Sequence, residues 1–189
     1  MGSAKGGGIV PMDPIARLQE LMEAAALPST SLELKRNEFL KTSGSIDTRL
    51  YYIDSGSLRI FFEDEFEEHT IRLGYTGNFI ASLDSFISEK PSDLYIQAIK
   101  KCRVTAYKKK DYTAFLSASI EAKEIWNSVN EWLIYQQIER EKDILIQSPK
   151  ARYKRVLERS PRLFQEIPLK YIASYLRVTP ETLSRLRNS

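Results

Sequence analysis

The sequence contains few of the residues that metal sites and nucleophilic enzymes require. Its 189 residues include a single histidine, His69, and a single cysteine, Cys102. Metal sites with nitrogen and sulfur ligands need clusters of these residues, and catalytic triads need a histidine beside the nucleophile. One cysteine also excludes an intramolecular disulfide and an iron–sulfur cluster, and it agrees with a reducing compartment. We therefore predict a cytoplasmic protein that is not an enzyme and has no metal site and no cofactor.

Long hydrophobic runs are also missing. No apolar run reaches the roughly 18 residues that a membrane-spanning helix needs, so we predict no membrane partner. Residues 1–12 contain no continuous apolar segment of the kind found in secretory signals. We expect these residues to form a flexible leader, with Met12 a candidate native start.

The net charge of +3 is small, but it is unevenly distributed along the chain. Residues 150–189 carry ten Lys and Arg against three Asp and Glu, a net +7, whereas the remainder of the chain carries a net −4. A basic segment attached to an acidic body indicates a polyanionic partner such as nucleic acid. A solvated basic face is the plainer alternative.

Hydrophobic periodicity divides the chain into regions. Residues 13–26 have apolar side chains at helical spacing and predict a short amphipathic helix. From about residue 31 to residue 107, short runs rich in aromatic and β-branched residues alternate with turn signals, which is typical of a small sandwich or jelly roll. Leu50–Ile53 and Leu58–Phe62 flank an Asp-Ser-Gly-Ser turn at 54–57, and we predict a hairpin there.

Residues 120–147 contain neither proline nor glycine and predict one long helix. At 1.5 Å per residue this helix is roughly 42 Å long, which is more than a chain of this size needs for its own packing. Its apolar stripe predicts a dimer seam, although the stripe could also pack on the β domain. The residues that we assign to the dimer interface are Ile125, Val129, Trp132 and Leu133.

Residues 167–186 predict two short helices joined by a tight turn. Ile172, Ala173 and Leu176 are the inward positions of the first helix, and Leu183 and Leu186 are those of the second. The outward face of the second helix then carries Glu181, Thr182, Ser184, Arg185 and Arg187. Such side chains suit a recognition helix, because arginine donates two bonds to guanine and glutamate accepts one from cytosine.

This segment resembles the helix-turn-helix of the Crp/Fnr family of transcription regulators, in a short variant. The signature is Ile-Ala-Ser-Tyr-Leu at 172–176, followed by Thr-Pro-Glu-Thr-Leu-Ser-Arg at 179–185. The order of the predicted elements also agrees, so the resemblance covers nearly all of the chain after Asp13. It implies an α+β protein with an N-terminal cyclic-nucleotide-binding-like β jelly roll (13–119), a long dimerisation helix (120–147) and a C-terminal helix-turn-helix DNA-binding domain (148–189).

The resemblance implies that Glu181 and Arg185 read bases and that Thr182 contacts phosphate. Pro180 stands where many members have a base-reading arginine, and Arg177 stands where the turn usually has glycine. The DNA-binding surface that we predict is Lys170, Arg177, Thr179, Glu181, Thr182, Ser184, Arg185 and Arg187, with Lys170 and Arg187 mainly holding phosphates. The expected partners are double-stranded DNA and a second copy of the chain, and RNA polymerase is a further candidate partner.

In this family the β domain holds a cyclic nucleotide between a Gly-Glu pair and an Arg-Ser or Arg-Thr pair. Ala81-Ser82 and Ser92-Asp93 occupy the matching positions, and no arginine occurs from residue 73 to residue 102. An aspartate repels a phosphate, and Lys90 is a poor replacement for a guanidinium fork. We therefore predict that cyclic AMP does not bind in the usual mode and that these four residues line a pocket for an unidentified small-molecule effector.

A second hypothesis is a small-molecule-sensing or protein-interaction module that keeps a relic DNA-binding domain. Pro180, Arg177 and the short segment that follows the second helix are what support it. Salt-dependent binding to duplex DNA distinguishes the two hypotheses, because phosphate contacts release counterions.

Overall fold

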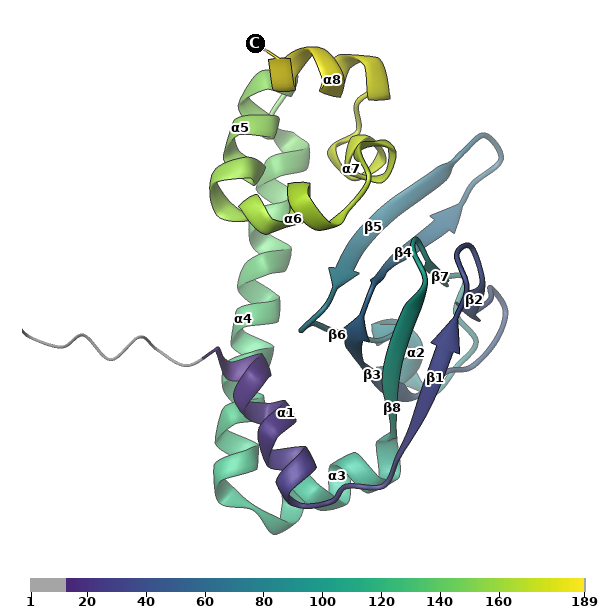
Figure 1. Ribbon diagram of the computed structural model, residues 1–189, viewed down its shortest axis with the longest axis vertical. Helices are drawn as coiled ribbons and strands as arrows, with labels where there is room; N and C mark the ends of the chain where they lie inside the picture. Colours follow the sequence, from purple (N-terminus) through teal and green to yellow (C-terminus); the bar gives the residue numbers. More distant parts are fainter. Residues whose placement is uncertain (1–12, 189) are drawn as a thin grey trace, which may run out of the picture.

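The computed structural model describes residues 13–188 (Figure 1). The predicted leader, residues 1–12, lies outside the described residues. The first helix, α1 (Pro14–Ala24), begins where the Asp13 carboxylate accepts a hydrogen bond from the backbone N–H of Ile15 at 3.0 Å. Pro14 suits the first helical position because the N–H that it lacks would have no partner within the helix.

Two four-stranded antiparallel sheets form a β-sandwich. The first sheet has the order β1 (Ser29–Leu34), β8 (Cys102–Lys108), β3 (Arg49–Ser55) and β6 (Phe79–Ile80). The second has the order β2 (Phe39–Lys41), β7 (Tyr95–Ala98), β4 (Ser57–Glu63) and β5 (Glu68–Tyr75), and the short helix α2 (Leu83–Ser88) connects β6 to β7. Apolar side chains from both sheets are fully buried between them, among them Ile53, Leu58, Ile96 and Val104.

The chain passes from one sheet to the other at Gly56. Because β3 and β4 lie in different sheets, the hairpin predicted across residues 54–57 is wrong. Gly56 has a φ of +87°, and a Cβ atom there would lie 2.2 Å from the carbonyl oxygen of Lys101. Only glycine fits such a corner. The turn exists, but it directs β4 away from β3 and into a ladder with β5.

Helix α3 (Lys109–Ala118) follows β8 and leads into α4 (Ile120–Leu145). The Ser119 hydroxyl caps α4 by accepting a hydrogen bond from the backbone N–H of Ala122 at 3.1 Å. Helix α4 runs along one side of the molecule, and α1 lies beside its first half (Figure 1). A second core forms there, in which Leu18 and Met22 of α1 pack with Tyr112 and Val129.

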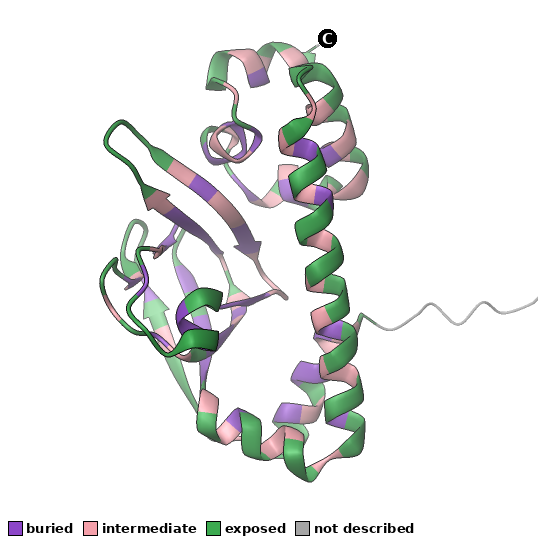
Figure 2. Cartoon of the chain, turned by 180° about the vertical axis from the view of Figure 1, so that it is seen from behind, coloured by how far each residue is buried: buried purple, intermediate pink, exposed green. Residues whose placement is uncertain are grey.

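The two faces of α4 differ in burial, which bears on the predicted dimer interface. Val129 is only 1% exposed, and Ile125 and Leu133 pack against the same core as α1, so these three residues serve the chain's own packing. Trp132 lies at the edge of that face and is 37% exposed. The opposite face is solvent-exposed (Figure 2) and carries apolar side chains at helical spacing: Ile120, Ile134, Tyr135, Ile138 and Leu145. Dimerisation itself stays a prediction, but the surface offered for it is this second face.

Four short helices complete the chain: α5 (Pro149–Arg159), α6 (Pro161–Glu166), α7 (Leu169–Leu176) and α8 (Pro180–Asn188). Their common core contains Val156, Leu163, Ile172 and Leu183. Proline stands at the start of α5 and α6, and the Ser148 hydroxyl caps α5 by accepting a hydrogen bond from the backbone N–H of Ala151 at 3.3 Å. Within residues 13–188, no helix is both long and apolar enough to cross a membrane.

Candidate nucleic-acid interface

The turn between α7 and α8 is built around Arg177. This residue adopts the left-handed conformation, with φ 53° and ψ 50°, in the position where the sequence predicted that a side chain must be tolerated. The backbone N–H of Val178 donates to the carbonyl of Ala173 at 3.0 Å, which closes the end of α7. Because Arg177 is exposed, its guanidinium points to solvent from the tip of the turn.

Thr179 caps helix α8. Its hydroxyl oxygen accepts a hydrogen bond from the backbone N–H of Thr182 at 3.2 Å, and its O–H donates to the Thr182 hydroxyl at 3.1 Å. A threonine in this position satisfies N–H groups that the helix leaves without partners. The structure thus gives Thr179 a folding role, and any DNA contact of Thr179 and Thr182 shares their oxygens with the cap.

The inward face of α8 is anchored by Leu183, which is fully buried beside the fully buried Ala173 of α7. The outward positions, four and seven residues apart, carry Glu181, Arg185 and Asn188, all of which are exposed. Ser184 lies next to them and is half-buried. Sequence reasoning missed Asn188, although its spacing of seven from Glu181 placed it on the same face. Asparagine is a natural reader of adenine.

The predicted phosphate contacts lie around this face. Lys170, at the start of α7, and Arg187, on the flank of α8, are both exposed. The Lys170 ammonium lies 5.1 Å from the ring centre of Tyr171. Figure 1 places α8 at one end of the molecule, where it packs on α5 and α7. A rod-shaped polyanion therefore has access to its outward face.

Helix α7 is docked on strand β5 by polar contacts. The Ser174 hydroxyl donates to the Thr70 hydroxyl at 3.0 Å. Arg140 of α4 joins both elements, because it donates to the Thr70 carbonyl at 2.8 Å and to the Tyr175 carbonyl at 3.1 Å. Burial lowers the pKa of Arg140 from its ordinary value, and the nearby Tyr175 opposes that effect. Leu73 of β5 adds an apolar contact to the core of the C-terminal helices.

Ion pairs join α4 to α5. Asp143 is 2% exposed and accepts from Arg155 Nε at 2.7 Å and from Arg159 Nη2 at 2.5 Å. Glu139, one turn earlier, also pairs with Arg155, and a hydrogen bond from Lys142 is the main cause that lowers the pKa of Glu139. Acids in the second half of α4 thus hold α5 against it.

The predicted nucleotide-site residues are brought together only in part. Ser82 and Ser92 are buried, and their hydroxyl oxygens lie 3.2 Å apart in a hydrogen bond. Ser82 also donates to the carboxylate of Asp84 at 2.9 Å. Ala81 is buried beside them, whereas Asp93 is exposed. The two hydroxyls therefore find their partners within the chain.

A buried lysine lies next to these serines, and sequence reasoning missed it. Lys41 of β2 is 4% exposed, and its ammonium donates to the carbonyls of Thr42, Ser92 and Leu94 at 3.1, 3.1 and 2.6 Å. An ammonium has three N–H donors, so all of them are used. Burial lowers the pKa of Lys41, while the Asp84 carboxylate favours its charge. Lys90, considered as a phosphate ligand, is exposed.

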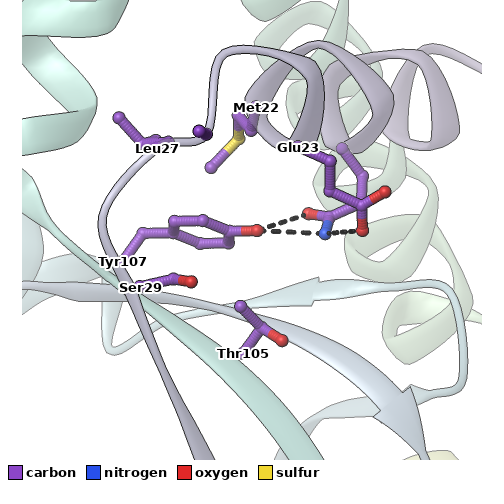
Figure 3. Close-up of a pocket in the computed structure, with 8 residues that line it drawn as sticks. Met22, Glu23, Leu27, Ser29, Thr105 and Tyr107 are labelled. Atoms are coloured by element: carbon purple, nitrogen blue, oxygen red, sulfur yellow. Dashed lines mark hydrogen bonds between the residues drawn. The ribbon is translucent and has the colours of Figure 1, made fainter.

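A pocket of about 330 Å³ lies between α1 and the first sheet (Figure 3). Its polar side chains bond to one another: Gln19 donates to Glu23 at 2.8 Å and to the Tyr107 hydroxyl at 3.0 Å. Burial raises the pKa of Tyr107. We assign no ligand to this pocket, because its buried polar groups are already paired. Within residues 13–188, no group of three or more His, Cys, Asp or Glu side chains is placed to hold a metal ion.

A β-sandwich followed by a long helix and a helix-turn-helix is the architecture of solved Crp/Fnr regulators, and the chain has this fold. Comparisons of the sequence with protein-family models and with curated proteins found no match. The fold is shown by solved structures.

The chain is similar to a CooA mutant from Carboxydothermus hydrogenoformans, with a TM-score of 0.73 and 14% identity over 90% of this chain and 82% of that one. It is similar to FixK2 from Bradyrhizobium japonicum, with a TM-score of 0.71 and 16% identity over 86% and 84%. It is also similar to the catabolite activator protein of Thermus thermophilus, with a TM-score of 0.56 and 18% identity over 96% and 84%. These matches confirm the predicted α+β fold.

Proposed function

We propose that the protein is a sequence-specific DNA-binding transcription regulator that acts in the cytoplasm as a homodimer. The observation that carries this proposal is the outward face of α8, where Glu181, Arg185 and Asn188 are exposed on a helix anchored by the buried Leu183. A helix of this kind enters the major groove, which is about 12 Å wide. Basic side chains at both flanks, Lys170 and Arg187 among them, then hold the phosphates.

The dimer is supported by the exposed apolar face of α4, which ends near the C-terminal helices. A two-fold axis along this face repeats α8 on the other side of the dimer. Two recognition helices about 34 Å apart read successive major grooves, so we expect a nearly palindromic operator.

Control by cyclic AMP in the usual mode is not part of this proposal. Ser82 and Ser92 hydrogen-bond to each other, and the Lys41 ammonium is saturated by carbonyl oxygens, so neither the two hydroxyls nor this ammonium is available to a cyclic phosphate. A ligand at 100 times its dissociation constant adds about 2.7 kcal/mol to the free energy of unfolding. We expect millimolar cyclic AMP to leave the melting temperature unchanged, and a clear rise would contradict this part of the proposal.

The test of DNA reading is a selection of bound duplexes from a random library, followed by fluorescence anisotropy titrations at two salt concentrations. Arg185→Ala should cost about 1–3 kcal/mol on the selected site and relax one base position in each half-site. Arg187→Ala should weaken all sequences alike and lower the salt slope by about one phosphate contact per monomer.

Arg36→Ala is the matched control, because Arg36 is exposed on the loop between β1 and β2 and the substitution removes the same charge. Equal losses for Arg185→Ala on every sequence would assign Arg185 to the phosphates. Absence of any salt-dependent duplex binding would instead favour the sensing or interaction module with a relic DNA-binding domain.

A further inference from the structure

An open pocket of about 510 Å³ lies where β3 begins and β8 runs into α3. This volume falls within the range of small-molecule sites, about 300–1,000 Å³. Its lining residues come from three parts of the chain: Thr48, Arg49, Glu89, Lys108, Lys109, Lys110 and Thr113. Four of these side chains are cationic and one is anionic, so the pocket is a basic hollow in the part of the chain, before residue 150, that is acidic overall.

The positive charges occupy positions that are electrostatically unfavourable for the folded chain. Arg49 and Lys108 stand directly opposite each other in the β3–β8 ladder, and like charges in that position destabilise a sheet. Lys108 is also the N-cap of α3, and its side chain makes no capping hydrogen bond. The helix N-terminus is the positive end of the dipole, where lysines at 108, 109 and 110 are unfavourable and only Asp111 of the first turn offsets them. A bound anion relieves both repulsions.

Two of the cations are held in place by the protein. The Asp47 carboxylate accepts from Arg49 Nε at 2.9 Å and from Arg49 Nη2 at 3.2 Å, while the Arg49 side chain stays 44% exposed. The Lys109 ammonium donates to the carbonyl of Phe86 at 2.5 Å and to Glu89 at 2.8 Å. Fixed cations bind an anion with less loss of conformational entropy.

The other two cations are free for a ligand. Lys108 and Lys110 are exposed, and neither forms an ion pair with any residue of the described range 13–188. Asp47 and Glu89 balance Arg49 and Lys109, which leaves two uncompensated charges and the helix N-terminus facing one hollow. From this arrangement we propose that the pocket binds a small multiply charged phosphate compound, such as a diphosphate or triphosphate group, between Arg49 and the lysines at 108 and 110. A guanidinium fork beside ammonium groups is a typical phosphate-binding set.

The anion is not the DNA that α8 reads. In Figure 1, α3 lies at the opposite end of α4 from α8. The 26 residues of α4 separate the two ends by about 39 Å at 1.5 Å per residue. The pocket also differs from the place where Ser82 and Ser92 meet, because it touches α2 at its other end, through the C-cap residue Glu89. Lys109 also lines the pocket, and its hydrogen bond to Phe86 connects α2 to α3, the helix that leads into α4. A bound phosphate therefore lies beside this connection.

Isothermal titration with sodium tripolyphosphate tests the proposal on the full chain, with sodium chloride at equal ionic strength as the blank. The site variant is Lys108→Gln with Lys110→Gln, which keeps a polar side chain of similar size and removes only exposed charges. The matched control is Lys35→Gln with Lys123→Gln, since both lysines are exposed, lie outside the pocket and form no ion pair within residues 13–188. We expect saturable binding that weakens by at least about tenfold in the site variant and by less than about twofold in the control.

An NMR titration locates the anion independently of any variant. The amide signals of Thr48, Lys109 and Lys110 should shift with the same saturation curve, while those of α8 stay unchanged. Equal weakening in both double variants, or shifts in α7 and α8 instead, would overturn the proposal, because the anion then binds the general basic surface or the DNA-binding face. Absence of saturable binding at millimolar tripolyphosphate would also overturn it. None of these outcomes depends on whether α8 binds DNA.

Discussion

The exposed face of α4 can be tested with one substitution, Ile138→Glu. Ile138 is 45% exposed in the isolated chain, and it lies between the more exposed Ile134 (61%) and Leu145 (75%). If these side chains form the dimer seam, the substitution places a carboxylate in the middle of an apolar contact. Each dimer contains two such carboxylates, because a two-fold interface uses the same residue from both copies.

The expected effect follows from the exposed fraction. Complete burial of an isoleucine side chain is worth about 1.5–3 kcal/mol, and with 45% of Ile138 still exposed, roughly half of that remains to be gained on association. Two copies contribute about 1.5–3 kcal/mol, and partial burial of two carboxylates adds about 1–2 kcal/mol or more. The dimer should therefore weaken by about 3–5 kcal/mol, which is on the order of a hundredfold to several thousandfold in Kd.

Sedimentation velocity over a concentration series measures this Kd. Ile46→Glu is the matched control, because Ile46 is 55% exposed on the loop between β2 and β3 and receives the same charge. Val129→Ala should lower the free energy of unfolding by about 1–3 kcal/mol through a cavity, yet leave association unchanged. The reasoning is refuted if Ile138→Glu keeps the Kd of the original protein, or if Val129→Ala weakens the dimer as strongly.

Three further substitutions or treatments test individual positions. Arg177→Gly should raise the free energy of unfolding by about 1 kcal/mol in urea titrations, because glycine removes the cost of the left-handed conformation, and it should also lower the salt slope of DNA binding. Tyr112→Phe should raise it by about 1 kcal/mol, since the buried hydroxyl finds no hydrogen-bond partner among residues 13–188. Burial raises the pKa of Cys102 to about 12, so at pH 8 the thiolate fraction is about a thousandfold below that of an unfolded thiol with a pKa of 9.0, and iodoacetamide should label only the denatured chain. As the pH rises, the thiol of the unfolded chain ionises before that of the folded chain. The contribution of Cys102 to the free energy of unfolding is therefore constant below pH 9.0 and decreases between pH 9.0 and about 12. Labelling of the native chain at pH 8, or a loss of stability in either variant, would contradict the corresponding reasoning.

Elements defined by local signals could be predicted from the sequence. The bounds of α7 and α8 follow from apolar spacing and from the cap at Thr179, which involve residues only a few positions apart. Features that depend on contacts between residues far apart in the sequence could not be predicted. The corner at Gly56 is imposed by the backbone of Lys101, and the contact of Ser174 with Thr70 joins residues 104 positions apart.

The faces of α4 show why an apolar stripe alone is ambiguous. Ile125, Val129 and Leu133 repeat every four residues, which is equally typical of a dimer seam and of packing on another helix of the same chain. The spacing does not reveal which helix covers the stripe, and in the structure it is α1 of the same chain. The second stripe has a gap between Ile120 and Ile134, and charged residues interrupt it. Its spacing is therefore hard to recognise in the sequence, although the structure shows the exposed apolar face clearly.

The family signature has two halves with different physical roles. In the first half, Ile172 and Ala173 are buried in the core, while Ser174 and Tyr175 contact β5 and Arg140 of the same chain. None of these four residues lies on the outward face of α8. A substitution in the first half therefore changes DNA affinity by moving α8 or by loosening α7 from β5, and it should alter the free energy of unfolding as well. A substitution at an exposed position of the second half, such as Arg185, should remove a proposed DNA contact and leave the fold intact. Measuring both quantities for each variant separates residues that position the recognition helix from those that read the base pairs.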